Sequence, residues 1–249
     1  MVSRRAPHRR GSPARHTTSK FWRHSCGTWL NDSFFTPELG LDNYEIFRSD
    51  KNHTTSDHSR EGGVLIAVHS SLPCVCMPSP FNLVEHLFVK ISLSPNPIVI
   101  STLYIPPSSP PSIYRNHFDS IYNIVTSFPP CNFLIVGDFN MPFIKWHFAS
   151  SSFSSPYLDN SSNSRNVSIY NDTVELLEAC NFHQLNTFPN CHNSILDLVF
   201  SNLLSVSLHI TVNSLLLLDL IILPLTSSPY AFQLSLCPLL SHTPSSLIM

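Results

Sequence analysis

Two polar side chains that suit phosphate chemistry follow a short apolar run in the middle of the chain. Asp138 and Asn140 come shortly after the run at residues 133–136. This run has the length and β-branched content of a buried strand, and Gly137 permits a sharp exit from it. Because side chains alternate along a strand, we predict Asp138 and Asn140 on one side, with Phe139 turned into the core. A carboxylate beside an amide can orient a water molecule and hold a phosphate oxygen.

The pattern Gly-Asp-x-Asn is short, and it also occurs in plain turns. Its interpretation therefore depends on the elements around it. Strands are expected at residues 44–47, 64–68, 87–93, 98–104, 133–136 and 195–200, where apolar and β-branched residues form short runs. A turn over residues 95–97 makes the third and fourth of these strands a hairpin.

Helical patterns are fewer. Residues 112–128 carry apolar side chains at helical spacing and predict one amphipathic helix. A second helix is expected from Asn171 or Asp172 to about Cys180, since Asn and Asp cap helices well. Residues 149–165 are rich in Ser and Asn and predict a long loop. Hairpins combined with strand–helix–strand units indicate a layered α/β sandwich with mixed sheets.

Composition indicates one folded domain with an unusual surface. The chain has 249 residues, enough for one sizeable core, and a formal net charge of −2 that points to no class of partner. Charged residues make up 12% of the chain, about half the usual share. There are 6 glycines against 21 prolines, so turns lack their usual residue. Such a composition is atypical of a protein selected to fold well.

The two ends of the chain differ from its middle. Residues 1–25 are basic and lack hydrophobic periodicity, which predicts a disordered tail; a nucleic-acid-binding or nuclear-targeting arm is the alternative. Residues 26–226 are expected to form the domain, and residues 227–249 a degenerate tail of apolar residues, Ser and Pro. No apolar segment of a secretory signal follows the basic residues, and residues 215–225 are too few to span a bilayer. We therefore expect an intracellular protein with no membrane partner.

The 7 cysteines predict no metal site. Cys180, His183, Cys191 and His192 can be drawn as four ligands, but their spacing matches no zinc template. Reduced thiols and surface histidines are the simpler interpretation.

Five motifs occur in a specific order along the chain. They are Trp29-Leu30, Arg60-Glu61-Gly62-Gly63-Val64, Tyr104-Ile105-Pro106-Pro107, Gly137-Asp138-Phe139-Asn140-Met141-Pro142 with Trp146, and Leu196-Asp197-Leu198-Val199-Phe200-Ser201-Asn202. In this order and at these distances the set resembles the endonuclease/exonuclease/phosphatase superfamily. Within that superfamily it is most similar to the apurinic-type endonuclease domain of non-LTR (LINE-like) retrotransposons. The resemblance covers about residues 26–225.

The resemblance implies a fold and an activity. The fold is an α/β four-layer αββα sandwich, in which two mixed β-sheets are flanked by helices and the active site lies on loops at one end of the sheets. The activity is hydrolysis of phosphodiester bonds in DNA with a divalent cation, Mg²⁺ or Mn²⁺, and no small-molecule cofactor. Such an enzyme would act in the nucleus.

The resemblance also assigns roles by position. Asp138 would orient or deprotonate the attacking water, Asn140 would hold phosphate or a metal-bound water, and Tyr104 would contact the phosphate. Asp138 and Asn140 are the expected contacts of the cation. Asp197 would orient a catalytic histidine through a hydrogen bond. Asp219 opens the C-terminal signature and is expected close to the other four.

The chain departs from the family pattern at three places. Gly27 stands where the family has the Glu that binds the metal. Ile222 stands where the C-terminal signature, which begins at Asp219, has its histidine. The family's first strand should precede Gly27, and residues 19–24 do not resemble it, so we expect that strand to be lacking.

These departures predict an impaired endonuclease. A positioned acid–base group contributes about 10²- to 10⁴-fold to the rate, and Ile222 offers neither a donor nor a charge. Without Glu at position 27, a Mg²⁺ site that has few protein ligands binds weakly if at all. Two alternatives remain at this point: a non-catalytic nucleic-acid-binding relic, and a superfamily phosphatase acting on small phosphoesters. Pro106, Pro107 and Trp146 favour the retrotransposon branch over the phosphatases.

Overall fold

The computed structural model describes residues 22–26, 35–39, 41–50, 63–79, 81, 83–128, 130–148, 154–190, 192–203, 206–213, 217–224 and 232–236. The tails predicted at residues 1–25 and 227–249 lie outside these ranges, except for one short strand in each. Within the described ranges, no helix combines the length and apolar character that crossing a membrane requires.

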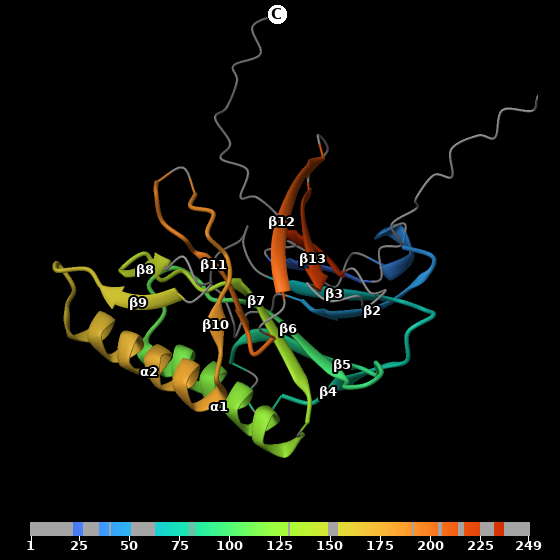
Figure 1. The fold of residues 1–249 in the computed structure, drawn as a ribbon, viewed down its shortest axis with the longest axis horizontal. Coiled ribbons are helices and arrows are strands. Elements are labelled where there is room, and N and C mark those ends of the chain that lie inside the picture. The colour runs from blue at the N-terminus through green and yellow to red at the C-terminus, as the bar shows by residue number, and fades with distance from the viewer. Residues whose placement is uncertain are drawn as a thin grey trace, which may run out of the picture.

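A six-stranded sheet forms the centre of the molecule, with strand order β10-β11-β7-β6-β5-β4 (Figure 1). Its strands are β4 (Cys74–Met77), β5 (Glu85–Ile91), β6 (Ile98–Tyr104), β7 (Asn132–Asp138), β10 (His183–Gln184) and β11 (Asp197–Ser201). The sheet is mixed, because β6 and β7 are parallel while the other neighbours are antiparallel. The predicted hairpin is confirmed as the pair β5–β6.

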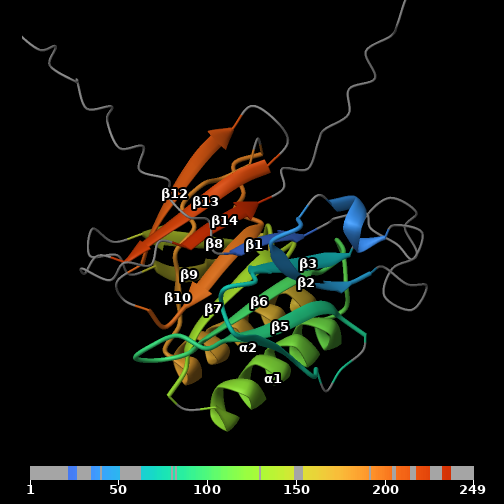
Figure 2. The same ribbon diagram turned by 90° about the vertical axis from the view of Figure 1, so that its right-hand side faces the viewer.

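Two helices cover one face of this sheet, α1 (Pro111–Ser127) and α2 (Ser164–Cys180) (Figure 2). The helix predicted from the pattern of residues 112–128 is confirmed as α1. The predicted start of the second helix at Asn171 or Asp172 is wrong. Asn163 is the cap, since its side chain accepts a hydrogen bond from the Asn166 backbone at 3.0 Å.

The loop predicted over residues 149–165 is also partly wrong. It contains β9 (Ser154–Leu158), which pairs antiparallel with β8 (Ile144–Phe148) in a small sheet of its own. β9 carries Pro156 and is flanked by a segment rich in Ser and Asn. Pro and Asn are depleted in strands, so the local sequence did not predict a strand whose pairing is supplied by its neighbour.

A second sheet packs on the other face of the six-stranded sheet. It contains β1 (Trp22–Cys26), β2 (Tyr44–Ser49) and β3 (Val64–His69), in the antiparallel order β1-β3-β2. Ile66 and Val68 of β3 join the apolar cluster between the two sheets. The α/β fold with two stacked sheets is thus as predicted. In the described ranges, the layer outside the second sheet consists of the single turn η1 (Thr36–Leu39), not of long helices.

Strand β1 lies where the sequence indicated none. It pairs along its whole length with β3, with Cys26 opposite Val64. Backbone pairing with a strand edge does not require an apolar pattern, which explains why the polar sequence of β1 concealed it. β1 directly precedes Gly27, where the family's first strand is expected, while residues 19–21 lie outside the described residues. Whether β1 is that strand is not decided by its pairing, so the lack of the family's first strand stays a prediction.

The C-terminal part forms a third, antiparallel sheet with order β12-β13-β14. Its strands are β12 (Val206–Asn213), β13 (Leu217–Pro224) and β14 (Phe232–Leu236). This sheet shares no strand with the six-stranded sheet, and β14 lies close to β1.

Candidate active site

Four polar side chains lie in one row across the six-stranded sheet. Asp138, the last residue of β7, stands opposite Tyr104 of β6 on one side and Asp197 of β11 on the other. Tyr104 in turn stands opposite Glu85 of β5. Neighbouring strands are about 4.8 Å apart, so the register brings together three residues that the sequence had singled out separately.

The row faces the second sheet. Val136 packs between the sheets, and Asp138 has the same parity along β7. Tyr104 packs against Val64, the first residue of β3. The other two members of the row share this face by the same alternation. The row therefore lies at one end of the two-sheet sandwich, and Asp138 is only 5% exposed there.

Gly137 matters for a different reason than the sequence suggested. It does not end the strand, because β7 continues through Asp138. A Cβ atom at this position would lie 2.2 Å from the Leu103 backbone oxygen and 2.7 Å from Leu103 Cδ2. Gly137 thus permits the close approach of β6 and β7 that sets Asp138 beside Tyr104.

Asn140 lies beside Asp138, but not through strand alternation. Its φ is 48°, in the left-handed region, so it lies in a turn after β7. Its backbone N–H donates to Asp138 Oδ1 at 3.0 Å, and its Nδ2 donates to the Ile105 backbone oxygen at 2.8 Å. Phe139 between them is fully buried in the core, as predicted. The turn, and not strand alternation, places the Asn140 backbone N–H against the Asp138 carboxylate.

Glu85 is a member of the row that the sequence reasoning missed. Its side chain is 2% exposed, and Oε2 accepts a hydrogen bond from the Gly63 backbone at 2.6 Å. This bond joins the two sheets at the end where the row lies. The strand was predicted to begin at Leu87, yet the alternation of that strand extends back to Glu85. A carboxylate on the apolar side of an alternating strand was the signal that could have found it.

Asp197 is supported by two buried amides in the segment before it. Asn186 Nδ2 donates to the Asp197 backbone oxygen at 2.6 Å. Gln184 Oε1 accepts from the backbones of Asn186 and Val199 at 2.9 and 3.0 Å. Gln184 and Asn186 are 1% and 2% exposed. These bonds fix the start of β11, and with it the position of Asp197 opposite Asp138.

Asp219 lies in a different sheet from the row, so its expected nearness to the other four residues stays a prediction. It lies within β13, opposite Thr211 and Ser235, in the separate C-terminal sheet. Ile222 lies in the same strand, opposite Leu208 and Phe232. The physical reason is the sequence Leu217–Pro224, whose aliphatic side chains favour strand pairing over the loop that the family signature needs.

The amino-acid sequence from β6 into the C-terminal sheet is similar to that of a known protein family. Residues 98–215 match a family described as endonuclease-reverse transcriptase, and this span holds Tyr104, Asp138 and Asp197. The chain contains an endonuclease/exonuclease/phosphatase-like domain. No curated protein sequence matches it.

The fold of this endonuclease-like domain has counterparts among solved structures. The endonuclease domain of TRAS1, a telomere-specific non-LTR retrotransposon, matches with a TM-score of 0.51 and 13% identity, over 86% of this chain and 96% of that chain. The catalytic domain of human Nocturnin gives 0.46 and 10%, over 76% and 71% of the two chains. A 3'-5' exonuclease from Neisseria meningitidis gives 0.45 and 11%, over 76% and 80%. The first match shows the fold; the other two are too distant to carry an argument.

The row of the endonuclease-like domain offers hard oxygen donors of the kind that Mg²⁺ prefers. One oxygen of Asp138 and one of Glu85 already accept backbone hydrogen bonds. In the part of the chain that the structure describes, no three His, Cys, Asp or Glu side chains are placed to share a metal ion. Asp138 and Asn140 therefore suit a cation chemically, but do not by themselves form a complete site.

Two histidines form a buried pair on the helix side of the sheet, beneath the row. His86 Nδ1 and His117 Nδ1 are 2.8 Å apart, and Ser79 Oγ contacts His86 Nε2. Burial lowers the pKa of His86 to about 4, and burial together with the charge of His86 lowers the pKa of His117 well below its ordinary value. The His117 ring also packs edge-on against Phe139, in the turn after Asp138. The neutral forms of both rings are therefore favoured beneath the site, because burial disfavours the charged forms.

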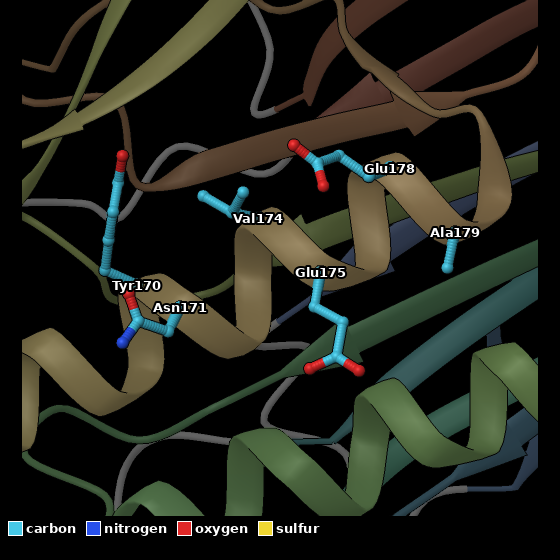
Figure 3. A pocket seen from close by; sticks show the side chains of 6 residues that line it. All are labelled: Tyr170, Asn171, Val174, Glu175, Glu178 and Ala179. Atoms are coloured by element: carbon cyan, nitrogen blue, oxygen red, sulfur yellow. The ribbon is translucent and has the colours of Figure 1, made fainter.

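A hollow of about 550 Å³ lies on α2, apart from the row. Its six lining residues all belong to that helix: Tyr170, Asn171, Val174, Glu175, Glu178 and Ala179 (Figure 3). The two carboxylates would repel phosphate, so this surface does not suit nucleic acid.

Proposed function

We propose that the chain is a retrotransposon-type DNA endonuclease domain that hydrolyses phosphodiester bonds, and that its turnover is impaired. The observation that carries the proposal is the register of β6, β7 and β11, which sets Tyr104, Asp138 and Asp197 side by side at one end of the two-sheet sandwich. DNA is the proposed partner, and the nucleus the proposed place of action.

In this proposal Asp138 accepts a proton from the attacking water or orients it. Asn140 and Tyr104 donate hydrogen bonds to the phosphate, since an amide and a phenol can both stabilise its negative charge. A divalent cation, Mg²⁺ or Mn²⁺, would neutralise phosphate charge when bound, with Asp138 and Asn140 as its contacts. Few protein ligands imply weak binding.

The impairment follows from position 27. Gly27 follows β1 directly in sequence and itself lies outside the described residues. The family pattern has a metal-binding Glu at this position, and glycine offers no carboxylate to a cation. The missing histidine removes an acid–base group that typically contributes about 10²- to 10⁴-fold.

A second candidate function is nucleic-acid binding without catalysis. The absence of a third metal ligand near Asp138 among the described residues favours it. A binder would unfold cooperatively and retain DNA in a salt-sensitive manner, whereas a relic that does not fold would do neither.

The test is nicking of supercoiled plasmid in Mg²⁺ by the full chain. We expect the unmodified chain to act barely above background and Gly27→Glu to raise the rate, with Asp138→Ala abolishing the gain. Asp119→Asn, at an exposed carboxylate of α1, is the matched control and should leave the rate unchanged. Robust nicking by the unmodified chain that depends on Asp138 would contradict the impairment. A folded Gly27→Glu variant with no nicking would contradict the endonuclease proposal.

A further inference from the structure

Tyr114 of α1 reaches the turn after Asp138 from behind the sheet. Its side chain is 0% exposed. The hydroxyl donates to the backbone oxygen of Phe139 at 3.0 Å and lies 3.3 Å from that of Asn140. A phenylalanine would fill the same apolar space. Packing therefore explains the aromatic ring but not the hydroxyl.

Arg165, at the start of α2, is close enough to this hydroxyl to act on its pKa. Its guanidinium donates to the Ser109 backbone oxygen, at 3.1 Å through Nε and also through Nη2. Ser109 lies in the loop between β6 and α1, just after Tyr104. Arg165 therefore connects the loop that follows one member of the row to the helix that begins at Ser164.

The charges around the hydroxyl agree with this geometry. Burial raises the pKa of Tyr114; the Arg165 guanidinium opposes this effect by charge and by a hydrogen bond, and the Asp138 carboxylate adds to it. Both charged groups thus lie close enough to act on the hydroxyl. A guanidinium beside the oxygen also makes the phenol a stronger donor to the turn.

Asn140 has a φ of 48°, in the left-handed region. Asparagine adopts this region more readily than most residues with a side chain, but it remains less favourable than the right-handed region, so contacts that hold it there matter. Its own donors bond to Asp138, two residues earlier, and to Ile105 in the segment after β6. Ile105 in turn donates its N–H to the Asp138 backbone oxygen at 2.9 Å. The turn is therefore tied to β6 on one side and to Tyr114 on the other.

We propose that Tyr114 and Arg165 are positioning residues that hold Asn140 in its left-handed conformation beside Asp138. The meaning of this for catalysis rests on the proposed function, in which Asn140 holds the phosphate. The effect of Tyr114 and Arg165 on the conformation of Asn140 is a property of the folded chain, and it can be measured without any nuclease activity.

The test is amide hydrogen exchange of the full chain, followed by NMR. In Tyr114→Phe, which removes only the hydroxyl, we expect the amides of Ile105 and Asn140 to exchange about 10-fold faster, as expected for one lost hydrogen bond. The amide of Leu134, inside β7, should change by less than about 2-fold. Arg165→Gln, which keeps a donor but removes the charge, should produce a smaller change at the same two amides.

Tyr122→Phe is the matched control, because Tyr122 is an exposed tyrosine on the same helix. It should leave all three amides unchanged. An equal acceleration at Leu134 in Tyr114→Phe would mean that Tyr114 only stabilises the core, and no acceleration at Asn140 would mean that its hydroxyl holds nothing. Either result overturns the proposal.

A kinetic arm separates this proposal from the proposed function. In the Gly27→Glu background, Tyr114→Phe should lower kcat for nicking about 10-fold with KM within about 2-fold, since a misplaced amide affects the reaction more than DNA capture. If Gly27→Glu does not nick at all, the proposed function fails, while the exchange result still decides the positioning role.

Discussion

Asp138 and Asp197 stand directly opposite each other on the antiparallel strands β7 and β11, at the end of the sandwich. Two carboxylates placed this way repel each other unless a proton, a hydrogen-bond donor or a cation lies near them. Their pairing therefore links the proposed chemistry to the stability of the fold, and a divalent cation should affect both.

The first prediction concerns that cation. Adding about 10 mM Mg²⁺ should raise the free energy of unfolding of the unmodified chain by less than about 0.5 kcal/mol, the value for a Kd near the added concentration. Gly27→Glu should increase this gain to more than about 1 kcal/mol by tightening the binding. Urea unfolding with KCl of equal ionic strength as reference measures both. A gain in Gly27→Glu that survives Asp138→Asn would show that the cation binds elsewhere.

The second prediction concerns the contact of β6 and β7. Gly137→Ala should destabilise the protein by at least about 1–3 kcal/mol, the usual cost of overpacking, because its Cβ would meet the Leu103 backbone. The Leu103 backbone oxygen is fixed in the sheet and cannot move aside as the end of a flexible side chain can. Urea unfolding measures the loss, and Ser120→Ala, a buried helical position of similar size, serves as control. A cost below about 0.5 kcal/mol would mean that the two strands separate easily.

The third prediction concerns acid. The pKa of His86 is lowered from 6.5 to about 4, and that of His117 is lowered as well, so the unfolded chain takes up protons first as the pH falls. The free energy of unfolding should therefore be highest above a pH of about 6.5, where both histidines are neutral in the folded and in the unfolded chain. Between pH 6.5 and 4 it should fall by about 1.4 kcal/mol per pH unit for each histidine. Denaturant unfolding between pH 7 and 5 measures the slope.

The control for the acid prediction is His147, an exposed histidine on β8. His147→Gln should leave the slope of the free energy of unfolding against pH unchanged. His86→Phe should reduce that slope by about 1.4 kcal/mol per pH unit, the contribution of one proton. Equal slopes in the unmodified chain and in His86→Phe would show that other groups cause the acid sensitivity.

The parts of the fold that were predictable are those with a strong local pattern. The β5–β6 hairpin and α1 follow from alternation and helical spacing, and β7 from a compact apolar run. The start of α2 was missed because Ser and Asn at residues 161–166 resemble a loop until Asn163 is recognised as a cap. β1 and β9 owe their pairing to partner strands, which local sequence does not reveal.

The motifs supplied three residues of the row and the expectation that they converge at one end of the sandwich, but not the contacts between them. Tyr104, Asp138 and Asp197 were found as separate motifs, and only the register shows that they are neighbours. The nearness of Asn140 to Asp138 was expected from alternation, yet it arises from a left-handed turn. Glu85, Tyr114 and Arg165 belong to no motif, because their roles depend on contacts between elements far apart in sequence.

The last prediction concerns Ile222, where sequence pattern and structure disagree. The family pattern places a histidine there, next to the active site. The structure places Ile222 in the middle of β13, between Leu208 and Phe232, in a sheet that shares no strand with the row. A histidine that stays within that strand would belong to the C-terminal sheet and not to the row.

We therefore expect Ile222→His to add nothing to the nicking activity of Gly27→Glu. If the histidine joined the site, the added acid–base group should raise the rate about 10²-fold or more. Plasmid nicking by Gly27→Glu with and without Ile222→His measures the difference. Ile221→His, at the neighbouring position in β13, is the matched control. A large gain from Ile222→His that is absent from Ile221→His would mean that the segment Leu217–Pro224 leaves its sheet and forms the family's C-terminal loop in the working enzyme.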